Sequence, residues 1–467
     1  MKNSLRNSFK IFWQLLLPVF IAFSMYKIVI DTSFITLLQI ILFFLFFLDC
    51  YISSYRADPF WVGSLFLYSF FVFLLGRIFL DFLGIKSMYY SDHYAWYTIS
   101  NNTTEVILIS YICFLLVYLV VVSTSKIGDM KNGQNQFKYQ GSSLLESLSE
   151  KVLLFCIPLG IANSIRIILT TDYISTFIYG NVEFSPLSIF SYIATATIPV
   201  YFASLPRRKH RTYIFALIIL MGAASALIGS RARFVSIIVF FLWYFKMSGM
   251  NIKLGKICAV SLLAILFTDF VYKSREVFLE YSALDTGWDI TNTFVVKMLY
   301  SLGGTHMVFA NYIDYRNEIF SDTHFYFING FINPIQRLLL NRSEFLAGRN
   351  ADLANISFSL DYKLMEAINP IAFAEGRGIG GNVVTEMWAF AGYIGVILGA
   401  IIFIKLFIYF SKKSCMSPGF FIINYYWLLN TVWAPRGSFL PDSLFLALSF
   451  IIYFLLNVII HRGKVTL

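Results

Sequence analysis

Long apolar stretches, separated by short polar breaks, recur along the whole chain. Each is about 20 residues long, which is enough for an α-helix to cross a hydrocarbon core of about 30 Å. Because helices satisfy their backbone hydrogen bonds internally in lipid, the pattern predicts an all-α polytopic membrane protein, a bundle of about twelve transmembrane helices. The predicted spans are residues 10–30, 33–53, 60–81, 104–124, 152–169, 187–205, 213–229, 234–250, 257–272, 386–410, 419–434 and 442–460.

Lysine and arginine gather on every second connection between these spans. Such residues are retained on the cytoplasmic side of a membrane, so both termini are predicted to be cytoplasmic. The net charge of +10 follows from this bias, in a chain that is otherwise 58% hydrophobic, and it gives no reason to expect binding to nucleic acid. The basic clusters are Lys2 to Lys10, Arg56, 126–151, 207–211, 246–256, Lys412 with Lys413, and Arg462 with Lys464.

One stretch, residues 273–385, departs from the apolar pattern and faces the outer side by the parity of the preceding spans. A loop of roughly 110 residues in a compact protein is usually functional or disordered. Its aromatic side chains, such as Trp288 and Phe327, predict ordered helices that cap the bundle and cover a cavity. The sequence therefore divides into 1–272 with about nine spans, the outer loop 273–385, and 386–467 with about three spans.

The five cysteines and five histidines follow no disulfide or metal-binding spacing. The cysteines lie in or beside predicted spans and are expected to be buried apolar residues, and no metal site is expected. The chain has no P-loop and no Asp-x-Asp pair, so a nucleotide-driven reaction has no recognisable site. It also has no internal repeat, which speaks against a transporter built of two symmetric halves.

Arginines stand out at the predicted outer ends of the spans and in the outer loop, where they oppose the insertion bias. In the segment 226–235, Gly229 and Ser230 end one span, and Arg231 and Arg233 precede the next. Two guanidinium groups in one tight turn can both bind a diphosphate bidentately. The alternative is that they are interface anchors, whose long side chains reach the membrane surface.

A second arginine turn lies in the segment 430–443. Arg436 follows Pro435, which helps to end the preceding helix, and Gly437 allows the backbone to approach a ligand closely. The alternative is a simple surface ion pair between Arg436 and Asp442.

The third segment, 374–399, has four glycines around Arg377 and then begins a helix that contains Asn382 and Glu386. Glycine-rich backbone before a helix N-terminus is suited to binding an anion, and we expect Gly381 and Asn382 to contribute to that site. Glu386 lies on the next turn and is a candidate general base, with Glu375 as the other candidate. The alternative for Glu386 is an acidic residue that only stabilises the helix dipole.

At these three segments the sequence resembles the bacterial Wzy-type O-antigen or oligosaccharide repeat-unit polymerases. A G-[ST]-R-x-[RN]-like turn of that family is matched by Gly229, Ser230, Arg231, Ala232 and Arg233. The family's helix start after the large loop is matched by Gly378, Gly381, Asn382, Glu386, Trp388, Gly392 and Gly395. Its turn before the last span is matched by Arg436 and Gly437.

The resemblance implies a multi-pass glycosyltransferase of the bacterial inner membrane, similar in type to the glycosyltransferase C fold, whose large periplasmic loop lies late in the chain. The implied reaction transfers a growing glycan from undecaprenyl diphosphate to a new lipid-linked repeat unit, in lipopolysaccharide O-antigen or a related polysaccharide. It requires no cofactor. Implied partners are the two lipid-linked glycans, membrane lipids, a chain-length regulator and a flippase. The implied roles are Arg231, Arg233 and Arg436 on the diphosphate, Arg337 and Arg377 on the second carrier or the glycan, and Glu386 or Glu375 as base.

Three other functions would leave different features in the sequence. O-antigen ligases share the Asn-to-Gly spacing but usually have a histidine directly before that asparagine, where this chain has Gly381. A lipid-linked oligosaccharide flippase should distribute its cationic residues along the bundle interior and have short loops on both faces. An anion transporter should have broken helices in paired repeats.

Overall fold

The computed structural model describes residues 4–56, 60–85, 99–125, 137–170, 186–227, 231–249, 294–319, 325–339, 350–374 and 378–465. These residues form helices joined by short turns, and no β-strand is found among them. In the first part of the chain the helices are α1 (Ser4–Ile30), α2 (Phe34–Arg56), α3 (Val62–Phe70), the π-helix η1 (Phe71–Leu75), α4 (Gly76–Phe82), α5 (Asn101–Thr124), α6 (Ser143–Thr170), α8 (Pro186–Ala203), α9 (Arg208–Leu227) and α10 (Arg231–Met247).

The second part of the chain contains several short helices and then three long ones. They are α12 (Phe294–Leu302), the 3₁₀ helix η6 (Gly303–Thr305), α13 (His306–Ile319), η7 (Tyr326–Ile328), α14 (Asn329–Leu339), α15 (Ala351–Ile356), α16 (Leu360–Ile368), α17 (Pro370–Ala374), α18 (Val383–Lys413), α19 (Pro418–Trp433), η9 (Ala434–Arg436) and α20 (Ser443–Val465).

Nine helical segments of the described residues are long and apolar enough to cross a membrane. They are Ile11–Ile30, Phe34–Tyr55, Val62–Phe82, Asn101–Thr124, Ser143–Leu169, Pro186–Ala203, His210–Leu227, Val383–Lys413 and Ser443–His461. Two further predicted spans, 234–250 and 419–434, correspond to the shorter apolar helix Phe234–Met247 and to the 16 residues of α19. The predicted span 257–272 lies outside the described residues. The all-α polytopic architecture is confirmed.

Two of the spans are not regular α-helices. The span Val62–Phe82 is interrupted by the π-helix η1, directly before Gly76 and Arg77. Helix α18 contains a kink at Ala391 and Gly392, where Gly392 has a φ of 60°, a conformation that favours glycine. Both irregularities lie towards the end of the bundle at which α10 and α18 begin and α19 ends. We call this end the outer end, and the opposite end the inner end.

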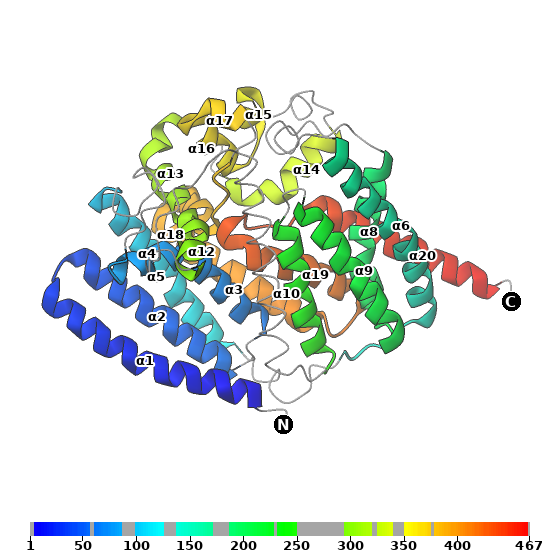
Figure 1. The fold of residues 1–467 in the computed structure, drawn as a ribbon, viewed down its shortest axis with the longest axis horizontal. Helices are drawn as coiled ribbons and strands as arrows, with labels where there is room; N and C mark the ends of the chain where they lie inside the picture. Colours follow the sequence, from blue (N-terminus) through cyan, green and yellow to red (C-terminus); the bar gives the residue numbers. More distant parts are fainter. Residues whose placement is uncertain are drawn as a thin grey trace.

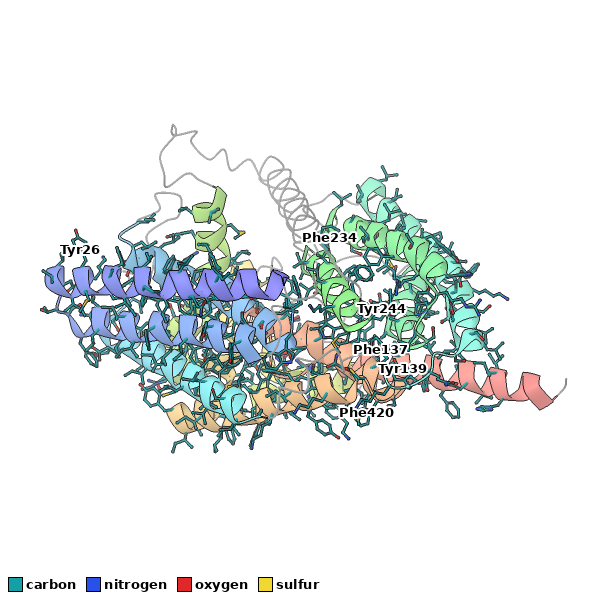
Figure 2. The ribbon with its side chains drawn as sticks, turned by 90° about the horizontal axis from the view of Figure 1, so that it is seen from below. Tyr26, Phe137, Tyr139, Phe234, Tyr244 and Phe420 are labelled. Atoms are coloured by element: carbon teal, nitrogen blue, oxygen red, sulfur yellow. The ribbon has the colours of Figure 1, made fainter. Side chains whose placement is uncertain are left out.

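Aromatic side chains make up much of the core, as expected for a chain with 19% aromatic residues. One group joins α3, α5 and α18, where the ring of Phe66 lies 5.6 Å from those of Phe114 and Phe403. Towards the inner end, Phe137 packs against Tyr244 of α10, with ring centroids 6.0 Å apart (Figure 2). The described cysteines are free thiols, and Cys50, Cys156 and Cys415 are buried.

Four of the short helices from the region 273–385 gather at one end of the molecule. Helices α13, α15, α16 and α17 lie together at the top of Figure 1, away from the N-terminus at the bottom. Tyr312 and Tyr326 pack there against Leu360 and Leu364 in a separate apolar cluster. The described part of this region is therefore ordered helix, as its aromatic content predicts. Its exact boundaries and its exposure to the periplasm stay predictions.

Candidate functional site

Two of the three arginine- and glycine-containing segments singled out in the sequence pack against each other through their backbones. Gly381, directly before α18, donates its amide hydrogen to the carbonyl oxygen of Arg436 at 3.2 Å. A Cβ atom at position 381 would lie 2.6 Å from the carbonyl oxygen of Gly437, so a larger residue would push the turns apart. Gly380 has a φ of 79°, which favours glycine, and it faces the side chain of Arg436. The two turns thus form one unit at the outer end.

Asn382 fixes the start of α18. Its side-chain oxygen accepts hydrogen bonds from the amides of Val384 at 2.9 Å and Thr385 at 3.4 Å, as a helix N-cap does. Its side-chain nitrogen donates to the hydroxyl of Tyr111 in α5 at 3.2 Å. Asn382 is fully buried, so its observed contacts orient the helix. Its predicted contact with substrate stays a prediction.

Glu386 is buried on the first turn of α18, with 1% of its surface exposed. One carboxylate oxygen accepts a hydrogen bond from the amide of Phe439 at 2.9 Å. The other accepts from the side chain of Asn329 at 3.4 Å. The carboxylate therefore ties α18 to the connection after Arg436 and to the start of α14. A group so enclosed is better placed to hold this turn than to reach a sugar hydroxyl.

Arg436 is exposed at the end of the 3₁₀ turn η9. Its guanidinium carbon lies 5.9 Å from the ring centre of Phe73, in the π-helix η1. Phe73 also contacts Trp433, at 5.3 Å between ring centroids. The two rings pack beside the turn, and the Arg436 residue as a whole is exposed.

Helix α10, which begins at Arg231, reaches the same place, while Gly229 and Ser230 of the segment 226–235 lie outside the described residues. The indole nitrogen of Trp433 donates a hydrogen bond to the hydroxyl of Ser236. Ser236 lies about one and a half helical turns after Arg231 and less than one turn after Arg233. The start of α10, with its two arginines, is therefore next to the turn that contains Arg436.

Less is known about the position of the remaining predicted residues, Arg337, Glu375 and Arg377. Arg337 lies near the end of α14, about 12 Å along the helix axis from Asn329, which contacts Glu386. Glu375 and Arg377 lie outside the described residues, and so does Arg349 of the outer loop. The structure therefore brings together Gly381, Asn382, Glu386, Arg436, Gly437 and the first turn of α10.

Sequence analysis missed Arg77 and His306, which lie beside this site. Arg77 is buried in α4, four residues after Phe73, and His306 is buried at the start of α13. An arginine within an apolar span is a signal of function in its own right. Arg77 lies inside the predicted span 60–81, whereas the predicted site residues come from the ends of spans and from the outer loop.

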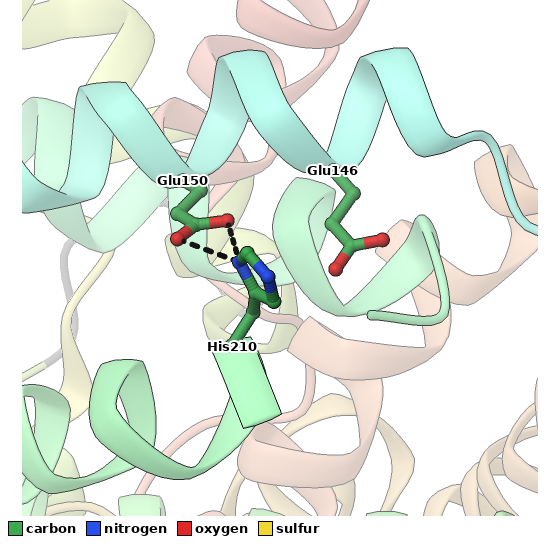
Figure 3. A group of neighbouring side chains, drawn as sticks. All are labelled: Glu146, Glu150 and His210. Carbon is green, nitrogen blue, oxygen red and sulfur yellow. Dashed lines mark hydrogen bonds and ion pairs between the residues drawn. The ribbon is translucent and has the colours of Figure 1, made fainter. Parts of the chain in front are cut away.

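One group in the described part of the chain has the side chains to hold a metal ion, and it lies at the inner end (Figure 3). Glu146 and Glu150 on α6 and His210 on α9 place their ligand atoms within 4.8 Å of one another. These atoms already have protein partners, since Nδ1 of His210 lies 2.9 Å from Glu150 and the amide of Arg207 donates to Glu146 at 2.9 Å. The group joins α6 to α9, about the length of α9 away from Arg231.

The fold is that of a multi-pass helical membrane protein, in which glycine-containing turns pack together with Arg436 at one end of the helices. A family model, O-antigen polysaccharide polymerase Wzy, matches residues 9–463, and the chain belongs to that family. The expected family and its polymerase function are confirmed, and its substrates are lipid-linked oligosaccharide repeat units. Comparison with curated proteins and with solved structures gave no match.

Proposed function

We propose that the protein is a glycosyltransferase that acts at the periplasmic face of the bacterial inner membrane. It transfers the growing glycan from undecaprenyl diphosphate to the non-reducing end of a new lipid-linked repeat unit. The observation that supports this best is that two turns and the start of α10 meet, through the bond from Gly381 to Arg436 and the bond from Trp433 to Ser236. They place an exposed arginine beside glycine-lined backbone, which is a suitable environment for a diphosphate.

In the proposed reaction, a hydroxyl oxygen of the acceptor sugar bonds to the anomeric carbon of the donor glycan. The bond from that carbon to the diphosphate breaks, the diphosphate leaves with the electron pair, and the hydroxyl proton passes to a base. Because the leaving group is already attached to the donor, no nucleotide is consumed. The protein needs to stabilise the departing negative charge and to accept the proton.

Arg436, Arg231 and Arg233 are proposed to bind the diphosphate, while Arg337 and Arg377 bind the second carrier or the glycan. Hydrogen bonds between arginine and phosphate contribute about 1.5–3 kcal/mol each. Two or three that strengthen in the transition state would accelerate the reaction by several powers of ten. A chain-length regulator and a flippase remain proposed partners.

The two carboxylates receive different roles. Glu386 is proposed as a positioning residue, because it is buried and bonded to the amide of Phe439. Glu375 is then the proposed base that takes the proton from the acceptor hydroxyl. This assignment narrows the sequence prediction, which left both residues open.

The function is tested by the glycans of cells that lack the protein. A polymerase is expected to leave surface glycans with a single repeat unit, and wild-type protein should restore the long chains. Complete absence of the glycan would indicate a flippase instead, and unchanged chain lengths would contradict both functions.

The orientation is tested separately by cysteine labelling in a variant without its native cysteines. Asn317 in α13 and Gln140 before α6 are predicted to lie on opposite sides of the membrane. A membrane-impermeant thiol reagent applied to spheroplasts should label Asn317→Cys and leave Gln140→Cys unlabelled. The reverse result would place the arginine turns in the cytoplasm and contradict the mechanism.

A further inference from the structure

Arg77 is a guanidinium group buried within a membrane span, with 6% of its surface exposed. Burying a charge is costly unless its donors are satisfied. The side-chain Nε of Arg77 donates to the carbonyl oxygen of Tyr300 at 2.5 Å, and its guanidinium carbon lies 4.2 Å from the ring centre of the same residue. Arg77 therefore anchors the end of α12 to α4.

Two glycines allow this close packing. A Cβ atom at Gly303 would lie 2.7 Å from the backbone nitrogen of Arg77, and a Cβ atom at Gly304 would lie 2.7 Å from a terminal nitrogen of its guanidinium. Neither position can accept a side chain without a shift of backbone or of the buried charge. The 3₁₀ turn η6 is thus shaped to the arginine.

His306 completes this arrangement as a neutral group. Its Nδ1 donates to the carbonyl oxygen of Gly303 at 2.6 Å, because a carbonyl oxygen can only accept. Burial and the nearby positive charge of Arg77 lower the pKa of His306 to about 3. The imidazole therefore adds no second positive charge beside Arg77 at neutral pH.

The π-helix η1 connects Arg77 to Arg436. It ends at Leu75, directly before α4, and it contacts both η6 and η9. Its residue Phe73 lies under the guanidinium of Arg436 and against Trp433. π-Helices within longer helices occur frequently at functional sites, because the extra residue displaces the side chains around it.

We propose that Arg77 is a positioning residue for polymerisation: it holds the π-helix η1 in place through Tyr300, Gly303 and Gly304, so that Phe73 sets the position of the Arg436 guanidinium. Arg77 itself touches no substrate in this scheme. The proposal rests on the proposed role of Arg436 at the diphosphate.

The test is a double-mutant cycle with Arg77→Lys and Arg436→Lys, in a polymerisation assay with purified protein and lipid-linked repeat units. Lysine keeps the charge but cannot reproduce both the hydrogen bond and the stacking on Tyr300. Arg77→Lys is expected to lower the turnover about 10–100-fold with little change in KM, because a displaced catalytic group slows the chemical step. In the Arg436→Lys background it should have almost no further effect.

The results distinguish a failure of this inference from a failure of the proposed diphosphate site. Equal losses from Arg77→Lys in both backgrounds would show a general structural effect and overturn the inference. Full activity of Arg436→Lys would instead overturn the proposed diphosphate site. If Arg77→Lys does not fold, Phe73→Leu replaces it in the same cycle, since this change leaves the contacts of Arg77 with Tyr300 intact and removes the ring that lies under Arg436 and against Trp433. Arg316→Lys, at an exposed position in α13, is the control and should behave like wild type.

Discussion

The inner and outer ends of the bundle hold their charges in different ways. At the inner end, the carboxylate of Glu150 contacts the imidazole of His210, and Glu146 accepts a hydrogen bond from the basic segment 207–211. At the outer end, Glu386 is bonded to neutral groups, the amide of Phe439 and the side chain of Asn329. The inner contacts are of the kind that join two helices. The outer contacts fix the shape of a turn whose arginine remains exposed.

The comparison indicates which side chains can be replaced by a neutral group and which need a particular charged group with its geometry. A carboxylate that accepts from a backbone amide can be replaced by a neutral acceptor of the same shape with little structural cost. An arginine that binds a diphosphate cannot be replaced by lysine, because the bidentate geometry is lost.

Among the residues that the structure describes, the largest effect is expected at the exposed arginine. Arg436→Lys should lower polymerisation by about 10²–10³-fold, the usual cost of removing one group that stabilises transition-state charge. The measurement is the initial rate of glycan elongation by purified protein, with Arg316→Lys as the matched control. Equal rates for both variants would make Arg436 an interface anchor.

A smaller effect is expected at the buried carboxylate, and it should depend on the replacement. Glu386→Gln keeps an oxygen that can accept from the amide of Phe439, so its turnover should fall less than about tenfold. Glu386→Ala removes that acceptor and should lower turnover about 10–100-fold through the displaced turn.

The same assay separates a positioning role from a base role. Were Glu386 the base, the glutamine variant would lose about 10²–10⁴-fold although the turn is intact. Glu375→Gln is the comparison: because Glu375 is the proposed base, this variant is expected to lose about 10²–10⁴-fold in turnover.

The spans could be predicted from the sequence because lipid imposes a fixed length of apolar helix. The turns at Arg436 and Gly381 could also be found, since glycine beside arginine is visible locally. The burial of Glu386 could not be predicted, because its partners Phe439 and Asn329 are 53 and 57 residues away. The proposed role of Arg77 could not be predicted either, because its partner Tyr300 is 223 residues away in the sequence.

The smallest effect is expected at the inner end. Glu150→Gln should leave polymerisation within about twofold of wild type, because the cluster lies far from the arginine turns. The His210 side chain is 49% exposed, so loss of this pair should lower the melting temperature by at most about 2 °C. A tenfold loss of activity at unchanged melting temperature would give the inner cluster a role in the reaction.

The central claim, that the outer arginine turn binds a diphosphate, is tested most directly by the affinity of purified protein for a polyprenyl diphosphate. The wild type should bind the diphosphate more tightly than the matching monophosphate. Arg436→Ala should weaken diphosphate binding about tenfold or more, which corresponds to about 1.4 kcal/mol, and Arg316→Ala should leave it unchanged. Equal affinities of wild type and Arg436→Ala for the diphosphate would contradict the account.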